Sequence, residues 1–165
     1  MVLGSPKQRN LAPGMGFEEG WGRALETLAP ALGLAVERGV TVCFEPLAPS
    51  ETNFINTAAE AVRLAKASGS PAMKIILDVK AMSSESRSIP EIIAASAPDF
   101  AYFHANDTNL KGPGFGAVDF HPILAALREA GYDGHVSVEV FNFDEGPEEI
   151  ATRSIEYLKR CLPQL

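Results

Sequence analysis

Short apolar runs alternate with longer segments of helical pattern along the whole chain, and this alternation limits the possible folds more than any other feature. Such an alternation is typical of repeated βα units around a parallel sheet, and we predict five units here. The expected strands are Val2–Leu3, Val40–Glu45, Met73–Asp78, Phe100–His104 and His135–Val140. The expected helices are Glu18–Arg38, Thr57–Ala67, Ile89–Ala97, Phe120–Ala130 and Glu148–Leu162.

The connections between these elements differ in length. Segments that follow strands are long and rich in Gly, Pro, Ser and Asn, whereas a return from helix to strand such as Ala130–Gly134 is short and contains helix-ending glycine. In parallel α/β folds the ligand binds at the carboxyl ends of the strands. The long loops therefore indicate a site at that end of the sheet.

The composition excludes several classes of partner. The chain has 165 residues, of which 46% are hydrophobic, and a net charge of −7, which disfavours nucleic acid held by phosphate attraction. No apolar run reaches the roughly 18 to 20 residues that a membrane-spanning helix needs, so no membrane partner is expected. Cys43 and Cys161 lie in different elements and no signal-peptide pattern is present, which predicts a cytoplasmic protein without disulfides.

We expect one domain over residues 1–165, because no linker, charge block or low-complexity segment divides the sequence. A closed (β/α)₈ barrel takes about 250 residues, so five units predict a partial barrel of the TIM type. We expect the units to be strands four to eight of such a barrel, with the N-terminal units missing. The chain would be the C-terminal portion of a barrel, a truncated gene product, or a partial barrel that pairs with another copy. We expect a homo-oligomer, since open sheet edges invite pairing.

Polar side chains end four successive expected strands, namely Glu45, Asp78, His104 and Glu139. Because the ends of neighbouring strands in a barrel converge on one mouth, we expect these side chains to face a common point. Three carboxylates and one imidazole form a mostly oxygen donor set, which suits Mn²⁺, Mg²⁺ or Co²⁺. Any one of these acids taken alone is more often a helix cap or a solvated loop residue, so the metal hypothesis depends on their occurrence in consecutive strands.

Several phrases of the sequence, taken in order, resemble the xylose-isomerase-like TIM barrels, a superfamily of sugar epimerases, sugar isomerases, inosose dehydratases and apurinic endonucleases. The resemblance runs from Val2 to about Leu162 and is strongest to the sugar phosphate isomerase/epimerase group, which includes the tagatose and psicose 3-epimerases. The intervals of 33, 26 and 35 residues between the four strand-end residues are similar to those of the epimerases. The phrases are Gly4–Arg9, Phe44–Leu47, Glu51–Asn53, Leu77–Asp78, Phe103–Asn109, Gly112–Phe120 and Val136–Glu139.

The resemblance implies that Glu45, Asp78, His104 and Glu139 bind one divalent metal ion, with Mn²⁺ expected and Mg²⁺, Co²⁺ or Zn²⁺ as alternatives. It also implies that Glu45 and Glu139 are catalytic and flank a sugar carbon, where one removes a proton and the other returns a proton on the opposite face. A cation beside the carbonyl stabilises the enediolate that forms. The implied activity is an isomerase or epimerase of a sugar or keto-sugar.

Two positions depart from the epimerase pattern. Ala81 stands where the epimerases have a histidine, and Leu110 stands where they have an arginine, and both positions contact substrate in that group. The departures leave the metal ligands intact but do not support tagatose or psicose as the substrate. The remaining candidates for substrate contact, of which the basic ones could bind a carboxylate, phosphate or keto oxygen, are Glu51, Lys80, Asp107, Lys111 and Arg9.

Other functions are compatible with the same scaffold. A lyase of the inosose dehydratase type would use the same metal centre and follow proton abstraction with loss of a β-hydroxyl group. A phosphodiesterase of the apurinic endonuclease type would need several metal ions and more histidines than the three present. The third alternative is an inactive partial barrel or an interaction module. The segment Gly112–Gly116 lacks the Lys-Ser/Thr ending of a phosphate-binding loop, so we interpret it as a turn that shapes the mouth.

Overall fold

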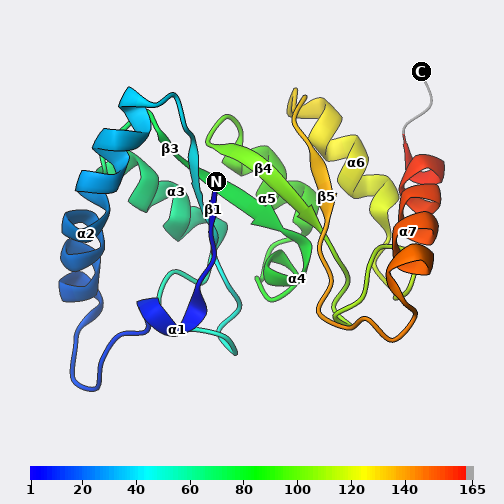
Figure 1. The fold of residues 1–165 in the computed structure, drawn as a ribbon, viewed down its shortest axis with the longest axis horizontal. Coiled ribbons are helices and arrows are strands. Elements are labelled where there is room, and N and C mark those ends of the chain that lie inside the picture. Colours follow the sequence, from blue (N-terminus) through cyan, green and yellow to red (C-terminus); the bar gives the residue numbers. More distant parts are fainter. Residues whose placement is uncertain (163–165) are drawn as a thin grey trace.

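The computed structural model describes residues 1–162, in which strands and helices alternate along the chain (Figure 1). The strands are β1 (Val2–Leu3), β2 (Val42–Phe44), β3 (Met73–Asp78), β4 (Phe100–Ala105) and β5 (Val136–Val138). The helices are α1 (Pro6–Arg9), α2 (Phe17–Glu37), α3 (Ala58–Ala67), α4 (Val79–Met82), α5 (Ile89–Ser96), α6 (Phe120–Glu129) and α7 (Pro147–Cys161).

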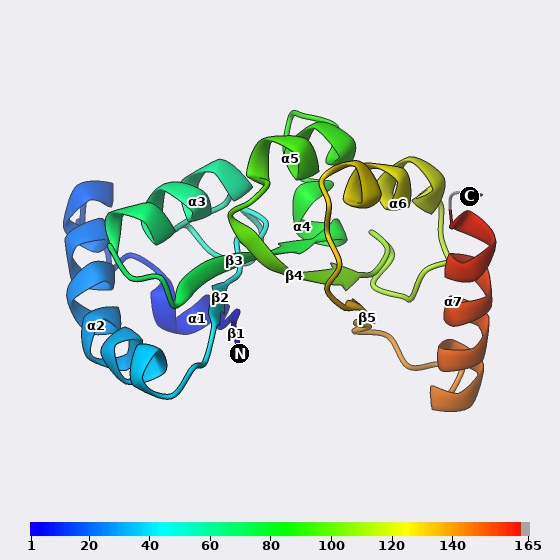
Figure 2. The same cartoon turned by 90° about the horizontal axis from the view of Figure 1, so that it is seen from above.

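The strands form one sheet in the order β1-β2-β3-β4-β5, and every neighbouring pair is parallel. Seen from above, α2, α3, α5, α6 and α7 form an arch on the convex side of this sheet, and its concave side faces the opening of the arch (Figure 2). Within the described residues, β1 and β5 are the two edges of the sheet. The predicted α/β fold, a partial barrel of the TIM type, is confirmed.

The core lies between the sheet and the helical arch. Strand residues Ile75, Leu77 and Phe103 have no exposed surface and pack in one cluster with Leu64 of α3 and Ile93 of α5. Full burial of an aliphatic or aromatic side chain of this size stabilises the fold by about 1.5 to 3 kcal/mol. Side chains alternate along a strand, so the residues next to these core positions project to the concave side of the sheet. The metal-ligand candidates are among the residues that face this concave side.

Two strands are shorter than the sequence predicts. The run Val40–Glu45 yields β2 over Val42–Phe44, and the run His135–Val140 yields β5 over Val136–Val138. Glu45 and Glu139 therefore lie one residue beyond their strands. Their backbone nitrogens nevertheless continue the ladder, since Glu45 N donates to Leu3 O at 3.1 Å and Glu139 N donates to Ala105 O at 3.1 Å.

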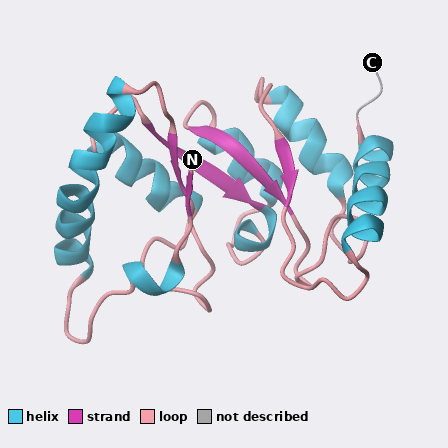
Figure 3. Cartoon of the chain, in the orientation of Figure 1, coloured by secondary structure: helices cyan, strands magenta, loops and turns pink. Residues whose placement is uncertain are grey.

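The two four-residue helices, α1 and α4, are absent from the prediction because one turn is too short to produce a helical period in the sequence. Helix α4 follows β3 directly, and α1 follows β1 after two residues. The loops that leave the strand arrowheads gather along the same side of the sheet (Figure 3). This side is where the predicted asymmetry of loop lengths places a binding site.

Among the described residues, no helix combines the length and the apolar character needed to cross a bilayer. The expected homo-oligomer stays a prediction. The sheet edges β1 and β5 are the parts of the fold that such an assembly would cover.

The start of α3 carries a reciprocal cap that can be tested. Thr57 Oγ1 accepts a hydrogen bond from Glu60 N at 3.2 Å, and Glu60 Oε2 accepts one from Thr57 N at 3.1 Å. We expect T57A to lower the free energy of unfolding by about 1 kcal/mol, because the first turn loses a hydrogen-bond acceptor. Urea denaturation followed by circular dichroism measures this change. The control T27A, at an exposed position inside α2, should change stability by less than about 0.5 kcal/mol, and an equal loss in both variants would contradict the assignment.

Candidate metal centre

Glu45, Asp78, His104 and Glu139 come together at the carboxyl ends of the strands. One ligand atom from each lies within 4.8 Å of the others. The register of the sheet explains this meeting, because β3 and β4 pair Asp78 directly with His104, while Glu45 and Glu139 follow the flanking strands β2 and β5. The structure thus gathers the four strand-end residues that the sequence singles out.

The imidazole of His104 occupies the middle of this group. Its Nδ1 atom lies 3.3 Å from Glu139 Oε2, 3.4 Å from Glu45 Oε1 and 3.8 Å from Asp78 Oδ2. Nδ1 is buried, and none of these contacts has hydrogen-bond geometry, so the nitrogen lacks a hydrogen-bond partner. A buried ring nitrogen that faces three carboxylates without such a partner is placed as a metal ligand would be. Three oxygen donors and one nitrogen donor fit a divalent ion such as Mn²⁺, Mg²⁺, Co²⁺ or Zn²⁺.

The loop after β1 makes room for Glu45 and supports its backbone. A Cβ atom added to Gly4 would overlap Glu45 Oε2, so glycine is the residue that lets this carboxylate reach the group. Arg9 Nη1 donates a hydrogen bond to the Glu45 carbonyl oxygen at 2.6 Å, and its guanidinium lies 4.7 Å above the Phe44 ring centroid. The segment Gly4–Arg9 therefore holds Glu45 from the neighbouring strand.

Asp78 is fixed by a donor on each carboxylate oxygen. It is the N-cap of α4, where Oδ1 accepts a hydrogen bond from Ala81 N at 2.8 Å, and Oδ2 accepts one from Asn106 Nδ2 at 2.6 Å. The sequence reasoning did not select Asn106. The only signal for it is its place two residues after His104, where the alternation of a strand puts both side chains on the same face.

The charges of the group shift the pKa values of its members in opposite directions. Burial, assisted by the charges of Glu45 and Glu139, raises the pKa of Asp78 to about 6. Burial alone would lower the pKa of His104, but the carboxylates of Glu139 and Glu45 outweigh it and raise that pKa to about 10. The contact with His104 lowers the pKa of Glu139. In the metal-free protein the imidazolium therefore balances part of the carboxylate charge, and a metal ion would replace its proton.

Two of the predicted substrate contacts form an ion pair near the group. Lys80 Nζ lies 2.8 Å from Glu51 Oε1 and 4.1 Å above the Phe141 ring centroid. Lys80 also lowers the pKa of Glu139, after the larger effect of His104 and against the effect of burial, which raises it. Lys80 and Glu51 line a hollow of about 330 Å³ together with Thr108 and other loop residues.

Asp107, Lys111 and Arg9 lie outside the four-residue group. Asp107 is buried, and its Oδ2 atom accepts a hydrogen bond from Val118 N at 2.9 Å, so its carboxylate organises the loop between β4 and α6. The ammonium of Lys111 pairs with Glu145. Their roles in substrate binding, like those of Glu51 and Lys80, stay predictions.

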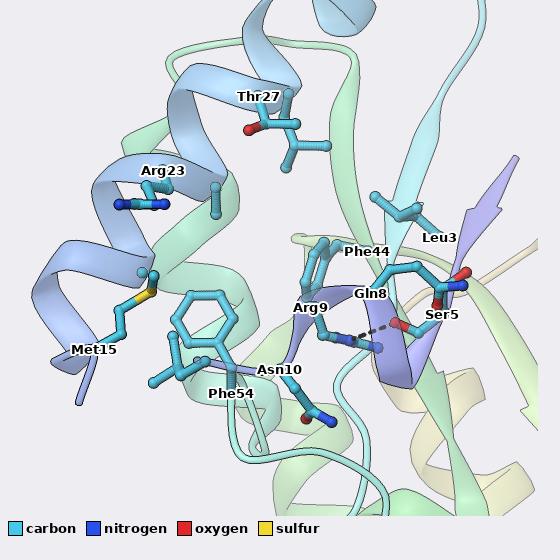
Figure 4. A pocket seen from close by; sticks show the side chains of 14 residues that line it. Leu3, Ser5, Gln8, Arg9, Asn10, Met15, Arg23, Thr27, Phe44 and Phe54 are labelled. Carbon is cyan, nitrogen blue, oxygen red and sulfur yellow. Dashed lines mark hydrogen bonds between the residues drawn. The ribbon is translucent and has the colours of Figure 1, made fainter. Parts of the chain in front are cut away.

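Arg9 also lines a second hollow, of about 380 Å³, between α2 and the edge of the sheet at β1. Figure 4 shows its guanidinium beside Phe44, with a hydrogen bond from Nε to Ser5 O at 3.3 Å. Leu3, Phe44 and Phe54 give this hollow an apolar wall. Both hydrogen bonds of Arg9 go to backbone oxygens, which is a supporting role for the loop that carries it.

Comparison with known proteins gives a family match over almost the whole chain. The family model described as xylose isomerase-like TIM barrel matches residues 2–161. A D-psicose 3-epimerase from Agrobacterium fabrum is 33% identical over 121 residues, which cover 73% of this chain and 42% of that relative. The chain thus spans less than half of the length of this relative.

Two solved structures share the fold. The apo form of a 3-keto-D-glucoside 4-epimerase from E. coli superposes with a TM-score of 0.88 at 24% identity, covering 97% of this chain and 63% of that one. A D-psicose 3-epimerase from Clostridium cellulolyticum H10, solved with D-tagatose, superposes with a TM-score of 0.85 at 24% identity, covering 99% of this chain and 65% of that one. At this identity the likeness establishes the fold of the described sheet and helices.

The contact between Gly4 and Glu45 predicts an effect on metal affinity. In G4A the added methyl group displaces the Glu45 carboxylate, so we expect Mn²⁺ to bind about tenfold more weakly or worse, as measured by isothermal titration calorimetry. G33A is the matched control, because a Cβ atom at Gly33 of α2 meets no heavy atom within 4 Å. Equal affinities in G4A and G33A would contradict the role assigned to Gly4.

The raised pKa of His104 predicts how the metal-free protein responds to pH. The folded state holds a proton on His104 up to about pH 10, whereas the unfolded chain releases it near 6.5, so this contribution to stability is complete below 6.5 and is lost as pH rises through 10. We expect the free energy of unfolding, measured in chelator-containing buffer, to fall over this window. The fall should disappear in H104Q and persist in H135Q, which replaces an exposed histidine. An identical fall in both variants would show that another group causes it.

Proposed function

The chain belongs to the xylose isomerase-like TIM barrel family, and from that premise we propose that it is a divalent-metal-dependent isomerase or epimerase of a sugar or keto-sugar. The observation that carries the proposal is the convergence of Glu45, Asp78, His104 and Glu139, whose ligand atoms lie within 4.8 Å of one another. The D-psicose 3-epimerase relative supports a substrate of the sugar class. We propose Mn²⁺ as the ion, since oxygen donors predominate in the group.

In this proposal Asp78 and His104 hold the ion from the two paired strands in the centre, and Glu45 and Glu139 bind it from the flanking strands. A bound divalent ion would polarise a sugar carbonyl and stabilise the negative charge that develops when the adjacent carbon loses its proton. The protein residues set the position of this charge. Gly4 and Arg9 fix Glu45, and the Ala81 and Asn106 donors fix Asp78.

Proton transfer is assigned to Glu45 and Glu139. They follow β2 and β5, with β3 and β4 between them, so they approach the centre from opposite flanks. One carboxylate oxygen removes the proton from the sugar carbon, and the other carboxyl group returns a proton to the opposite face, which inverts that carbon. The low pKa of Glu139 keeps its carboxylate ionised and able to accept a proton at neutral pH.

Substrate recognition is assigned to the rim of the centre. Lys80 and Glu51 pair with each other, and sugar hydroxyl groups could replace this pairing by accepting a hydrogen bond from Lys80 and donating one to Glu51. The other proposed substrate contacts are Asp107, Lys111 and Arg9. Ala81 and Leu110 replace the histidine and arginine that contact substrate in the tagatose and psicose 3-epimerases, so neither tagatose nor psicose is proposed as the substrate. We also propose a homo-oligomer.

Proton transfer through an enediolate predicts exchange with solvent. Incubation of the Mn²⁺-loaded protein with a panel of keto-sugars in deuterium oxide should incorporate deuterium at the inverted carbon, as detected by nuclear magnetic resonance. We expect E139Q to slow turnover by about 10²- to 10⁴-fold, because an amide cannot accept the proton. Removal of metal by a chelator should abolish the reaction, and added Mn²⁺ should restore it.

The control for this experiment is E148Q, which changes an exposed glutamate in the first turn of α7 and should leave turnover unchanged. Unchanged turnover in E139Q would remove Glu139 from the reaction. A dehydrated product in place of an epimer would assign the centre to a lyase. Bound Mn²⁺ with neither exchange nor product across the panel would contradict the proposed activity.

A further inference from the structure

We propose that Asn106 is a positioning residue of the metal centre, whose carboxamide holds the Asp78 carboxylate in the orientation that faces the other three ligand side chains. This inference rests on the metal centre of the proposed function. Asn106 follows β4 directly and has no exposed surface. It is not one of the four ligand candidates, and the ligand candidate that it hydrogen-bonds is Asp78.

The hydrogen bonds of Asn106 fix which end of its carboxamide faces Asp78. Lys80 N lies 2.7 Å from Asn106 Oδ1, and a backbone N–H can only donate, so the oxygen of the amide must be on that side. The amino group is then left to face Asp78, where Nδ2 lies 2.6 Å from Oδ2. The donor to the carboxylate is therefore determined by geometry.

Asn106 contacts the carboxylate oxygen that matters for the centre. Asp78 Oδ2 is the oxygen that lies 3.8 Å from His104 Nδ1, while Oδ1 is turned away to accept the hydrogen bond from Ala81 N. With a donor on each oxygen, the carboxylate cannot rotate about its last torsion without breaking a buried hydrogen bond. Oδ2 retains a second lone pair that can reach a cation, because each carboxylate oxygen accepts at two sites.

The same side chain also joins the ends of two neighbouring strands. Asn106 extends from the end of β4, and its two partners, Asp78 and the Lys80 backbone, belong to the end of β3 and the first turn of α4. The pair of ligands Asp78 and His104 sits across this junction. Asn106 thus limits movement of one ligand relative to the other, as expected of a residue that orients a metal ligand from outside the coordination sphere.

The inference is tested by measuring Mn²⁺ affinity in N106A and N106L, with the full chain and isothermal titration calorimetry. N106L has the same number and branching of side-chain heavy atoms as asparagine but has neither the donor nor the acceptor. We expect the Mn²⁺ dissociation constant to rise about ten- to hundredfold in both variants. Should N106A fail to fold, N106L alone decides the question.

The matched control is N56A. Asn56 is a partly buried amide, and its Nδ2 atom donates to the backbone oxygens of Leu47 at 2.8 Å and Thr52 at 2.9 Å, neither of which belongs to the centre. We expect N56A to lower the melting temperature without changing Mn²⁺ affinity. The rise in melting temperature on adding Mn²⁺ should be as large in N56A as in the unmodified protein and smaller in the Asn106 variants.

The outcomes separate this inference from the proposed function. Unchanged Mn²⁺ affinity in the Asn106 variants, with an equal loss of melting temperature in the presence and absence of Mn²⁺, would show a purely structural role and overturn the inference alone. Weaker Mn²⁺ binding in those variants would support it even if no keto-sugar is converted by the unmodified protein. An unmodified protein that binds no Mn²⁺ would overturn both.

Discussion

Three carboxylates lie at one end of the sheet around a single imidazole, and their mutual repulsion must be offset by the groups around them. Burial is the main cause of the raised pKa of Asp78, and the charges of Glu45 and Glu139 add to it. Hydrogen-bond donors stabilise these residues: Ala81 N and Asn106 Nδ2 donate to the Asp78 carboxylate, and the Arg9 guanidinium donates to the backbone oxygen of Glu45. The negative charge that these donors do not neutralise is balanced by protonated His104 or by a bound cation.

Much of this arrangement follows from sequence alone, because period and loop length act over many residues. The alternation of apolar runs predicts all five strands, and the rule that parallel strands end at one edge predicts that Glu45, Asp78, His104 and Glu139 meet. Exact boundaries are harder to predict, since a strand ends where pairing ends and pairing depends on the neighbour. For this reason β2 and β5 are each shorter than their apolar runs.

The residues that sequence reasoning missed act through single contacts between segments far apart in the chain. Asn106 touches Asp78 across 28 positions, and Gly4 matters only because the Glu45 carboxylate crosses it. Neither contact has a periodic signature. The same holds for the ion pair between Lys80 and Glu51, which joins α4 to the loop after β2 and which the positions of the two residues in the sequence do not indicate.

Each of the four ligand candidates comes from a different βα unit, and the units are consecutive neighbours in the sheet. No single unit, and no pair of them, can assemble the centre by itself. A slip of β3 by one residue against β4 would turn Asp78 from the concave side into the helical layer and break the group. Ion binding at this centre therefore indicates that four units are packed together in the correct register. Spectroscopic measures of helix and strand content cannot make this distinction, because a looser assembly of the same elements would give the same content.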